Sequence, residues 1–188
     1  CKKALRLFGI SAEWENEYTI FIRGGQSYSA KDITYAMEKG REAGFFVTYN
    51  HPTWSLEDYT DYMQYEGMHA FEMFNGSSIK NGYEDYNPRV YDDMLRAGKR
   101  IYCVATDDNH NGSHPDSFGG FTMIKAEKLE YSTVTQALLD GHFYASEAPL
   151  IYELYYDTED QSIHISTSEA VMIVMATGLR SNTSHVVT

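Results

Sequence analysis

The sequence has few cysteines, few basic residues relative to acidic ones, and no long apolar run. Two cysteines in 188 residues exclude a disulfide scaffold, so a reducing compartment, the cytoplasm, is expected. Fifteen Lys and Arg against 27 Asp and Glu give a formal net charge of −12, which argues against a protein held on large nucleic acids by its overall charge. No apolar run approaches the roughly 20 residues that a membrane-spanning helix needs, so no membrane partner is expected. A small phosphorylated substrate stays possible, because a bound metal can reverse the local field.

Hydrophobic residues make up 43% of the chain and aromatic residues 14%, enough for a packed core in one domain with a small appendage. The chain begins at Cys1, shows no signal peptide, and continues into Leu5–Ile10, which is typical of a buried strand. A lipoprotein that carries its lipid on Cys1 is the alternative to a cytoplasmic protein. Because a polar tether normally follows such a cysteine, we expect instead a chain that starts within a longer protein.

Strands and helices alternate through the middle of the sequence. Capping-box pairs predict helix starts at Ser29 and Ser55, and glycines at 44, 98 and 141 predict helix ends. The expected helices cover about 29–43, 55–65, 88–97 and 132–140, and the expected strands 45–49, 70–74, 101–105 and 119–125. This alternation is typical of βαβ units, so we predict an α/β fold with a mainly parallel sheet or barrel.

The pattern changes after Pro149. The runs 150–156, 162–167 and 170–176 read as short strands joined by polar turns, as in Ser162–Ser166, where apolar and polar residues alternate. We therefore predict a first domain over residues 1–148 and a small antiparallel β appendage over 149–188. The last run ends only a few residues before Thr188, so we expect this sheet to have an open edge strand.

Residues of the kinds that bind metals follow three successive predicted strands. Asn50-His51-Pro52 comes after the first, Asn75 follows the second, which contains Glu72, and Asp107-Asp108-Asn109-His110 follows the third. Taken alone, a His-Pro pair is usually a turn, and the Asp-Asp-Asn-His run equally suits a solvated loop. The carboxyl ends of parallel strands share one rim, so the three segments together favour a site for zinc, manganese or iron.

These motifs, in this order, carry a family resemblance. Tyr-Asn-His-Pro (49–52), Phe-Glu-Met-Phe-Asn-Gly (71–76) and Ala-Thr-Asp-Asp-Asn-His (105–110) resemble the later motifs of the polymerase and histidinol phosphatase (PHP) superfamily. The segment 137–146 is similar to one in its predicted metal-dependent phosphoesterase and metalloesterase branch, where a strand-rich tail follows. The resemblance implies a distorted, seven-stranded β/α barrel that holds two or three metal ions through His, Asp and Glu side chains.

The resemblance also implies roles for individual residues. Asp107 either assists the chemistry or replaces Asp108 as a ligand, and His142 either stabilises a helix end or faces a substrate phosphate. The implied metal ligands are Glu13, His51, Asp108 and His110; the candidate catalytic residues are Asp107 and Glu72; the candidate substrate-binding residues are Asn75 and His142.

The sequence departs from the family at its beginning. The family opens with a His-x-His motif and soon adds an Asp-His pair. Here the histidines stand at 51, 69, 110, 114, 142, 164 and 185, so no two are two positions apart and none follows an aspartate. We therefore expect a PHP-like barrel that is incomplete at its N-terminus and retains at most about half of the ligand set.

The expected function is that of a metal-dependent phosphoesterase acting on a small phosphate ester through metal-activated water. The alternatives are a carboxylic or carbamate ester hydrolase of the same fold, and a non-catalytic PHP-like binding or assembly module. With so few ligands, this 188-residue chain alone is expected to be a poor enzyme. The sheet edge left by the missing barrel strands is expected to make it self-associate, so a homo-oligomer is a candidate assembly.

Overall fold

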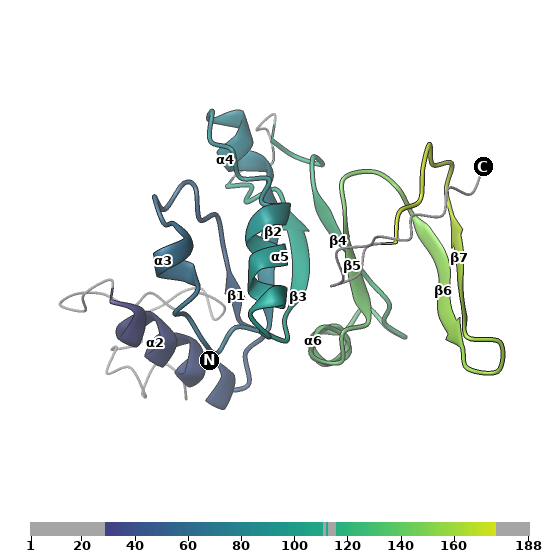
Figure 1. The fold of residues 1–188 in the computed structure, drawn as a ribbon, viewed down its shortest axis with the longest axis horizontal. Helices are drawn as coiled ribbons and strands as arrows, with labels where there is room; N and C mark the ends of the chain where they lie inside the picture. Colours follow the sequence, from purple (N-terminus) through teal and green to yellow (C-terminus); the bar gives the residue numbers. More distant parts are fainter. Residues whose placement is uncertain (1–28, 111, 113–115, 176–188) are drawn as a thin grey trace. The chain divides into compact units, whose positions relative to one another are not determined.

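A computed structural model gives the structure of residues 29–110, 112 and 116–175 (Figure 1). The chain divides into two compact units, Cys1–Ala145 and Ser146–Thr188, which are described separately. This boundary lies three residues before the one expected from the sequence. The expected strand over 5–10 and the candidate ligand Glu13 lie outside the described residues.

The first unit contains a parallel sheet of three strands in the order β1-β2-β3. Its strands are β1 (Thr48–Tyr49), β2 (Ala70–Asn75) and β3 (Tyr102–Thr106). They are parallel, as the alternation of strands and helices predicted. The central strand β2 is buried along almost its whole length, which agrees with its apolar sequence. The carboxyl ends of all three strands therefore meet at one edge of the sheet.

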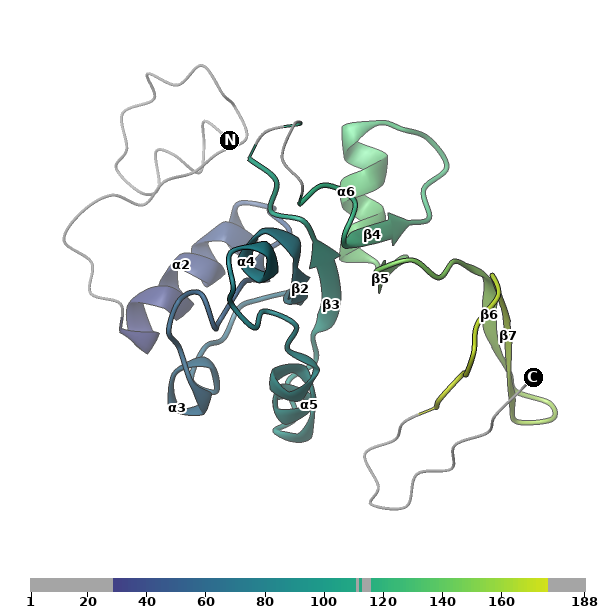
Figure 2. The ribbon, with the colours of Figure 1, turned by 90° about the horizontal axis from the view of Figure 1, so that it is seen from above.

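Five helices and a second, two-stranded sheet complete the described part of this unit. Helix α5 packs against β2, and α6 packs against β4. Helix α4 follows β2 without a connecting loop (Figures 1 and 2). The helices are α2 (Ala30–Glu42), α3 (Tyr59–Tyr62), α4 (Gly76–Lys80), α5 (Pro88–Arg96) and α6 (Tyr131–Leu139), and the strands are β4 (Phe121–Ile124) and β5 (Phe143–Ser146).

The predicted start of α2 is confirmed, and that of α3 is wrong. The Ser29 hydroxyl accepts a hydrogen bond from the amide of Asp32 at 3.2 Å, as an N-cap does. Helix α3 starts after Asp58, which forms a capping box with Asp61, and it is only one turn long. The reason is that the predicted cap, Ser55, has another partner: its hydroxyl lies 3.1 Å from Nδ1 of His51.

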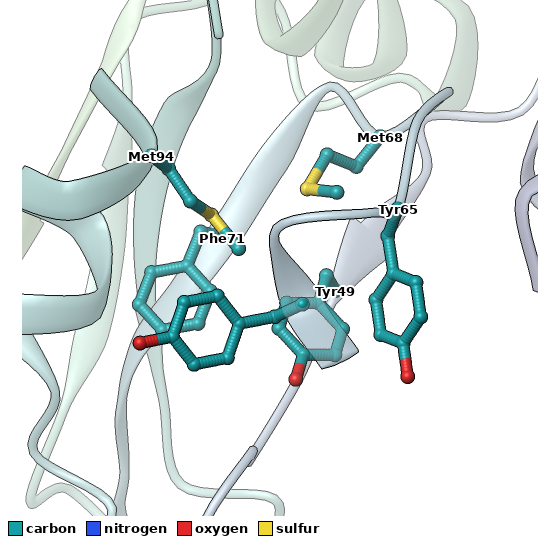
Figure 3. Close-up of a cluster of buried hydrophobic side chains, with 6 residues drawn as sticks. Tyr49, Tyr65, Met68, Phe71 and Met94 are labelled. Atoms are coloured by element: carbon teal, nitrogen blue, oxygen red, sulfur yellow. The ribbon is translucent and has the colours of Figure 1, made fainter. Parts of the chain in front are cut away.

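A cluster of tyrosines, methionines and one phenylalanine forms the hydrophobic core of the first unit (Figure 3). Two of the tyrosines keep their hydroxyls satisfied, because Glu57 accepts hydrogen bonds from Tyr49 at 2.6 Å and from Tyr65 at 2.7 Å. Burial, followed by these bonds to Glu57, raises the pKa of both phenols. The buried members are Tyr49, Tyr62, Tyr65, Met68, Phe71 and Met94.

The described part of the second unit is an antiparallel hairpin of β6 (Ile151–Asp157) and β7 (Ser162–Thr167). The third strand predicted for this unit is wrong over residues 170–175, which have no strand conformation. Val171 is fully exposed there, and no described strand pairs with the segment. An extended apolar run forms a strand only where a neighbour supplies hydrogen bonds.

Among the sheets that the described residues form, none closes into a barrel, so the PHP-like barrel stays a prediction. Within the same residues, no helix combines the length and the apolar character needed to cross a membrane.

Candidate functional site

A cavity of about 430 Å³ lies where the three parallel strands end. Its walls come from the loop after β1, from α4 after β2 and from the loop after β3. In open α/β sheets, ligands bind outside the carboxyl ends of the strands, where the loops that follow the strands form such a cavity. The residues that line it are His51, Trp54, Ser77, Ser78, Asn81, Asp108, His110 and Asp116.

Three of the four metal ligands expected from the sequence line this one cavity: His51, Asp108 and His110. The backbones of His51 and Asp108 are in the left-handed region, with φ of 35° and 49°. Such conformations cost energy in residues other than glycine and cluster at functional sites. Both strained residues therefore stand where a strand turns into the cavity wall.

The ligand atoms of these residues are not drawn together at one point. Within residues 29–110, 112 and 116–175, the one group of three whose ligand atoms all lie within 4.8 Å of one another is Asp157, Asp160 and His164, on the second unit. That group is mostly exposed, as acidic surface residues commonly are without a metal. In the cavity, Asp108 and His110 are exposed side chains with room to turn toward an ion.

The imidazole of His51 is held from several sides. Its Nδ1 lies 3.1 Å from the hydroxyl of Ser55, and its ring meets the indole of Trp54 at 5.0 Å between centroids, at 72°. Its backbone amide donates to a carboxylate oxygen of Glu72 at 3.0 Å. A hydrogen bond at one ring nitrogen orients the imidazole of a metal-binding histidine and leaves the other nitrogen for the metal. Here that other nitrogen is Nε2.

Glu72 lies beneath the cavity and not in its wall. Its side chain is buried and accepts hydrogen bonds from the His51 amide, from Asn75 Nδ2 at 3.0 Å and from the Thr106 hydroxyl at 2.5 Å. Burial raises the pKa of this carboxyl, and these three hydrogen bonds act in the opposite direction. One carboxylate thus connects the ends of β1, β2 and β3. Its predicted catalytic role stays a prediction, and its contacts favour a positioning role.

Asn75 is also buried, and it links Glu72 to a candidate ligand. Its Nδ2 donates both to Glu72 and to Asp108 Oδ2, the latter at 3.3 Å. Its Oδ1 accepts from the amide of Ser78 at 2.9 Å and so caps α4. Asn75 does not line the cavity, and its contacts orient Asp108 and α4; its predicted role in substrate binding stays a prediction.

Asp107 faces the turn before β4. Its carboxylate accepts hydrogen bonds from the amides of Phe118, Gly119 and Gly120, the last two at 2.9 and 2.8 Å. It is absent from the cavity lining, whereas its neighbour Asp108 belongs to it. The alternative in which Asp107 replaces Asp108 as a ligand therefore has less support from the geometry.

His142 lies away from the cavity, just after α6. Its amide donates to the carbonyl of Ala137 at 2.8 Å, which closes the helix end. Its side chain borders a separate open groove of about 520 Å³, together with Gln136 and Asp140. His142 thus lies at the end of α6 and outside the candidate cavity, and its predicted substrate-binding role stays a prediction.

Three residues at the site escaped the sequence reasoning. Asp85 is buried and accepts from the amides of Thr53 at 2.9 Å and Trp54 at 3.1 Å, so it fixes the loop that carries His51. Asp116 is a buried carboxylate in the cavity wall, hydrogen bonded by Asn109 Nδ2 at 2.7 Å. Nothing in the local sequence marks either aspartate, whereas Trp54, three positions after His51, could have been noticed as an aromatic neighbour of a candidate ligand.

The cavity is acidic. Two carboxylates, Asp108 and Asp116, line it together with two imidazoles, and its described lining includes no Lys or Arg. Carboxylate and imidazole form a donor set suited to a divalent transition metal, so the residues present fit the metal that the sequence motifs imply.

Comparisons of the chain with protein-family models, with curated proteins and with solved structures found no match.

Proposed function

We propose that this chain carries the metal site of a metal-dependent phosphoesterase that acts on a small phosphate ester. The observation that carries the proposal is the meeting of His51, Asp108 and His110 in one cavity. They come from two loops far apart in the sequence, His51 from the loop after β1 and Asp108 and His110 from the loop after β3, which meet at the edge where the parallel strands end. The resemblance of the same segments to PHP motifs supports the proposal independently of the geometry.

The proposed ligands are His51, Asp108 and His110, with Asp116 added from the structure. Manganese, iron or zinc suits these donors. Such a metal polarises an ester and lowers the pKa of a bound water. The chain itself supplies orientation: Ser55 and Glu72 hold His51, while Asn75 holds Asp108. In an acidic cavity a phosphate would be repelled without a cation, which is a further reason to expect a metal there.

Elemental analysis tests the metal site directly. Protein purified without chelator should contain manganese, iron or zinc, and the double variant His51→Ala/His110→Ala should lose it. The control is His142→Ala, which also removes an imidazole but leaves the cavity lining intact. Equal metal content in the cavity variant and the wild type would refute the proposed ligands.

Hydrolysis tests the reaction. We expect the chain to cleave 4-nitrophenyl phosphate when manganese is added, and EDTA to abolish the cleavage. We expect slow turnover, because the ligand set is smaller than the one the family uses. A rate that EDTA leaves unchanged would contradict the proposed metal-dependent mechanism.

One observation favours a second candidate, hydrolysis of a carboxylic or carbamate ester. Such an ester is uncharged and needs no Lys or Arg, and none is found among the described residues of the cavity wall. Chelator-sensitive cleavage of 4-nitrophenyl acetate without cleavage of the phosphate would select this candidate. Metal binding without either activity would select the non-catalytic module. For the compartment we propose the cytoplasm, on the basis of the two cysteines.

A further inference from the structure

We infer that Trp54 forms a subsite for a planar aromatic group on the substrate, so that the preferred ester has an aromatic leaving group. This inference rests on the proposed hydrolase function and names its substrate class. It starts from an unusual feature: a tryptophan that lines a cavity and is still 55% exposed. Indole is the largest aromatic side chain, and its faces stack well on other planar groups.

The indole stands next to a candidate metal ligand. Its ring and the imidazole of His51 are in edge contact, with centroids 5.0 Å apart. A group stacked on Trp54 would therefore lie beside the place where His51 holds an ion. An ester bound with its reacting atom at the ion places its leaving group within reach of the indole.

The loop that carries Trp54 is fixed before any ligand binds. The two carboxylate oxygens of Asp85 accept hydrogen bonds from the consecutive amides of Thr53 and Trp54. Pro52, just before them, is buried, and the amide of Ser55 donates to the carbonyl of His51 at 3.0 Å. A surface that is already ordered loses little conformational entropy on binding, which favours recognition by a rigid ring.

Apart from Trp54 and the proposed metal ligands, the described part of the cavity wall is uncharged. Helix α4 contributes Ser77 and Ser78, and Asn81 follows it. These are neutral hydrogen-bonding residues, and the described lining holds no Lys or Arg for a second anionic group. The non-reacting part of the substrate is therefore expected to be uncharged. Trp54 then offers the largest contact surface, and a planar ring suits it best.

The test uses two phosphonates, because their carbon–phosphorus bond is not cleaved by hydrolysis. The full chain, loaded with manganese, is titrated with phenylphosphonate and with ethylphosphonate by calorimetry. We expect phenylphosphonate to bind about tenfold more tightly, as stacking on an aromatic side chain provides. Trp54→Ala should abolish this preference, and Trp54→Phe should keep most of it. The control is Tyr59→Ala, which removes an equally exposed aromatic side chain outside the cavity lining and should change nothing.

The outcomes separate this inference from the proposed function. If Trp54→Ala keeps the phenyl preference, or weakens both phosphonates equally while lowering the melting temperature, Trp54 is a packing residue and the inference is refuted. If manganese does not bind, but phenylphosphonate still binds more tightly and only through Trp54, the subsite stands and the hydrolase proposal fails. Chelator-sensitive hydrolysis with equal affinity for both phosphonates would support the hydrolase proposal and refute the subsite.

Discussion

At the scale of single residues, Glu72 is the side chain on which most of the candidate site depends. Its carboxylate accepts hydrogen bonds from the amide of His51 and from Asn75, and Asn75 also donates to Asp108. Glutamine has the same shape. Its oxygen can accept from His51 and Asn75, and its NH₂ group can donate to the Thr106 hydroxyl. Glu72→Gln should therefore preserve the fold while removing one negative charge from beneath the metal ligands.

We expect Glu72→Gln to weaken manganese binding about tenfold, because it removes a negative charge close to the residues that would hold the cation. The melting temperature of the metal-free variant at pH 7 should equal or exceed that of the wild type, because a buried carboxylate with a raised pKa opposes folding when it is charged. Calorimetry and thermal unfolding measure the two quantities. Glu84→Gln, at an exposed position, is the control. Unchanged manganese affinity in Glu72→Gln would show that Glu72 does not act on the site.

His69 gives the stability of the first unit a pH dependence of known sign. Its Nδ1 accepts a hydrogen bond from the amide of Val47 at 3.0 Å, which requires the neutral ring. Burial, assisted by the charge of Arg41, lowers its pKa below the ordinary 6.5. The unfolded chain therefore binds a proton on His69 more readily than the folded chain does. As a result, the free energy of unfolding decreases as the pH falls below about 6.5.

The prediction for His69 compares how steeply the melting temperature depends on pH in a variant and in the wild type. Between pH 7 and pH 5, the melting temperature should fall less in His69→Gln than in the wild type, because the glutamine oxygen can accept from Val47 but does not titrate. His164→Gln, on the exposed surface of the hairpin, should fall as the wild type does. Equal slopes in His69→Gln and the wild type would mean that His69 does not carry this dependence.

The candidate ligands could be found from the sequence, whereas the residues that hold them in place through hydrogen bonds could not. His51, Asp108 and His110 stand soon after short apolar runs, and such a run identifies a buried strand and therefore its end. Glu72 was recognised as polar within a strand, but its role depends on burial between two neighbouring strands. Asp85 acts on a loop more than 30 positions earlier in the chain. Contacts of this kind follow from the tertiary fold and leave no local pattern.

At the scale of secondary-structure elements, the junction between β2 and α4 shapes the cavity. Gly76 starts α4 immediately after Asn75, and it lies against Asp107 on the neighbouring loop. A Cβ at this position would come within 2.8 Å of Asp107 Oδ1 and 3.2 Å of Asp107 Cα. Three backbone amides hold that carboxylate in place, so it cannot move aside freely.

Gly76→Ala should therefore destabilise the chain by about 1–3 kcal/mol, the usual cost of an added methyl group in a packed position. It should also weaken metal binding, because α4 and the loop of Asp108 are forced apart. Chemical denaturation and manganese titration measure the two effects. Gly112→Ala is the control, since no atom of the described residues lies within 4 Å of a Cβ built there. A variant as stable as the wild type would show that the junction is not tight.

The helix starts show how tertiary contacts select among local signals. Ser55 and Asp58 are both good caps, and each is followed by an acidic residue three positions later. The chain uses Asp58, because Ser55 contacts His51 and the loop from 51 to 56 follows its own path, with Leu56 at a positive φ of 58°. The sequence therefore predicts that a helix begins in this region, whereas the contacts of the loop around His51 determine the residue at which it begins.

At the scale of the whole molecule, the sequence predicts the parallel sheet because alternating strands and helices leave little other choice. It does not predict the short pairing of β1, which is only two residues long because Phe45 to Val47 lie outside the ladder. It also predicts one strand too many in the second unit, where the run after Glu169 has strand-like residues but pairs with no described strand. Pairing over long sequence distances determines both outcomes, and residue type alone does not report it.

The division into two units leads to a prediction about where metal binding is encoded. The described residues that line the candidate cavity all lie between His51 and Asp116, within the first unit, and so do Glu72, Asn75 and Asp85. The β6–β7 hairpin pairs only with itself among the described strands. A chain that ends after Ser146, the last residue of β5, should therefore bind manganese with the same affinity and stoichiometry as the full chain. Circular dichroism establishes that the shortened chain is folded, and calorimetry compares the two affinities. Loss of manganese binding by a shortened chain that remains folded would place an essential part of the site in the second unit.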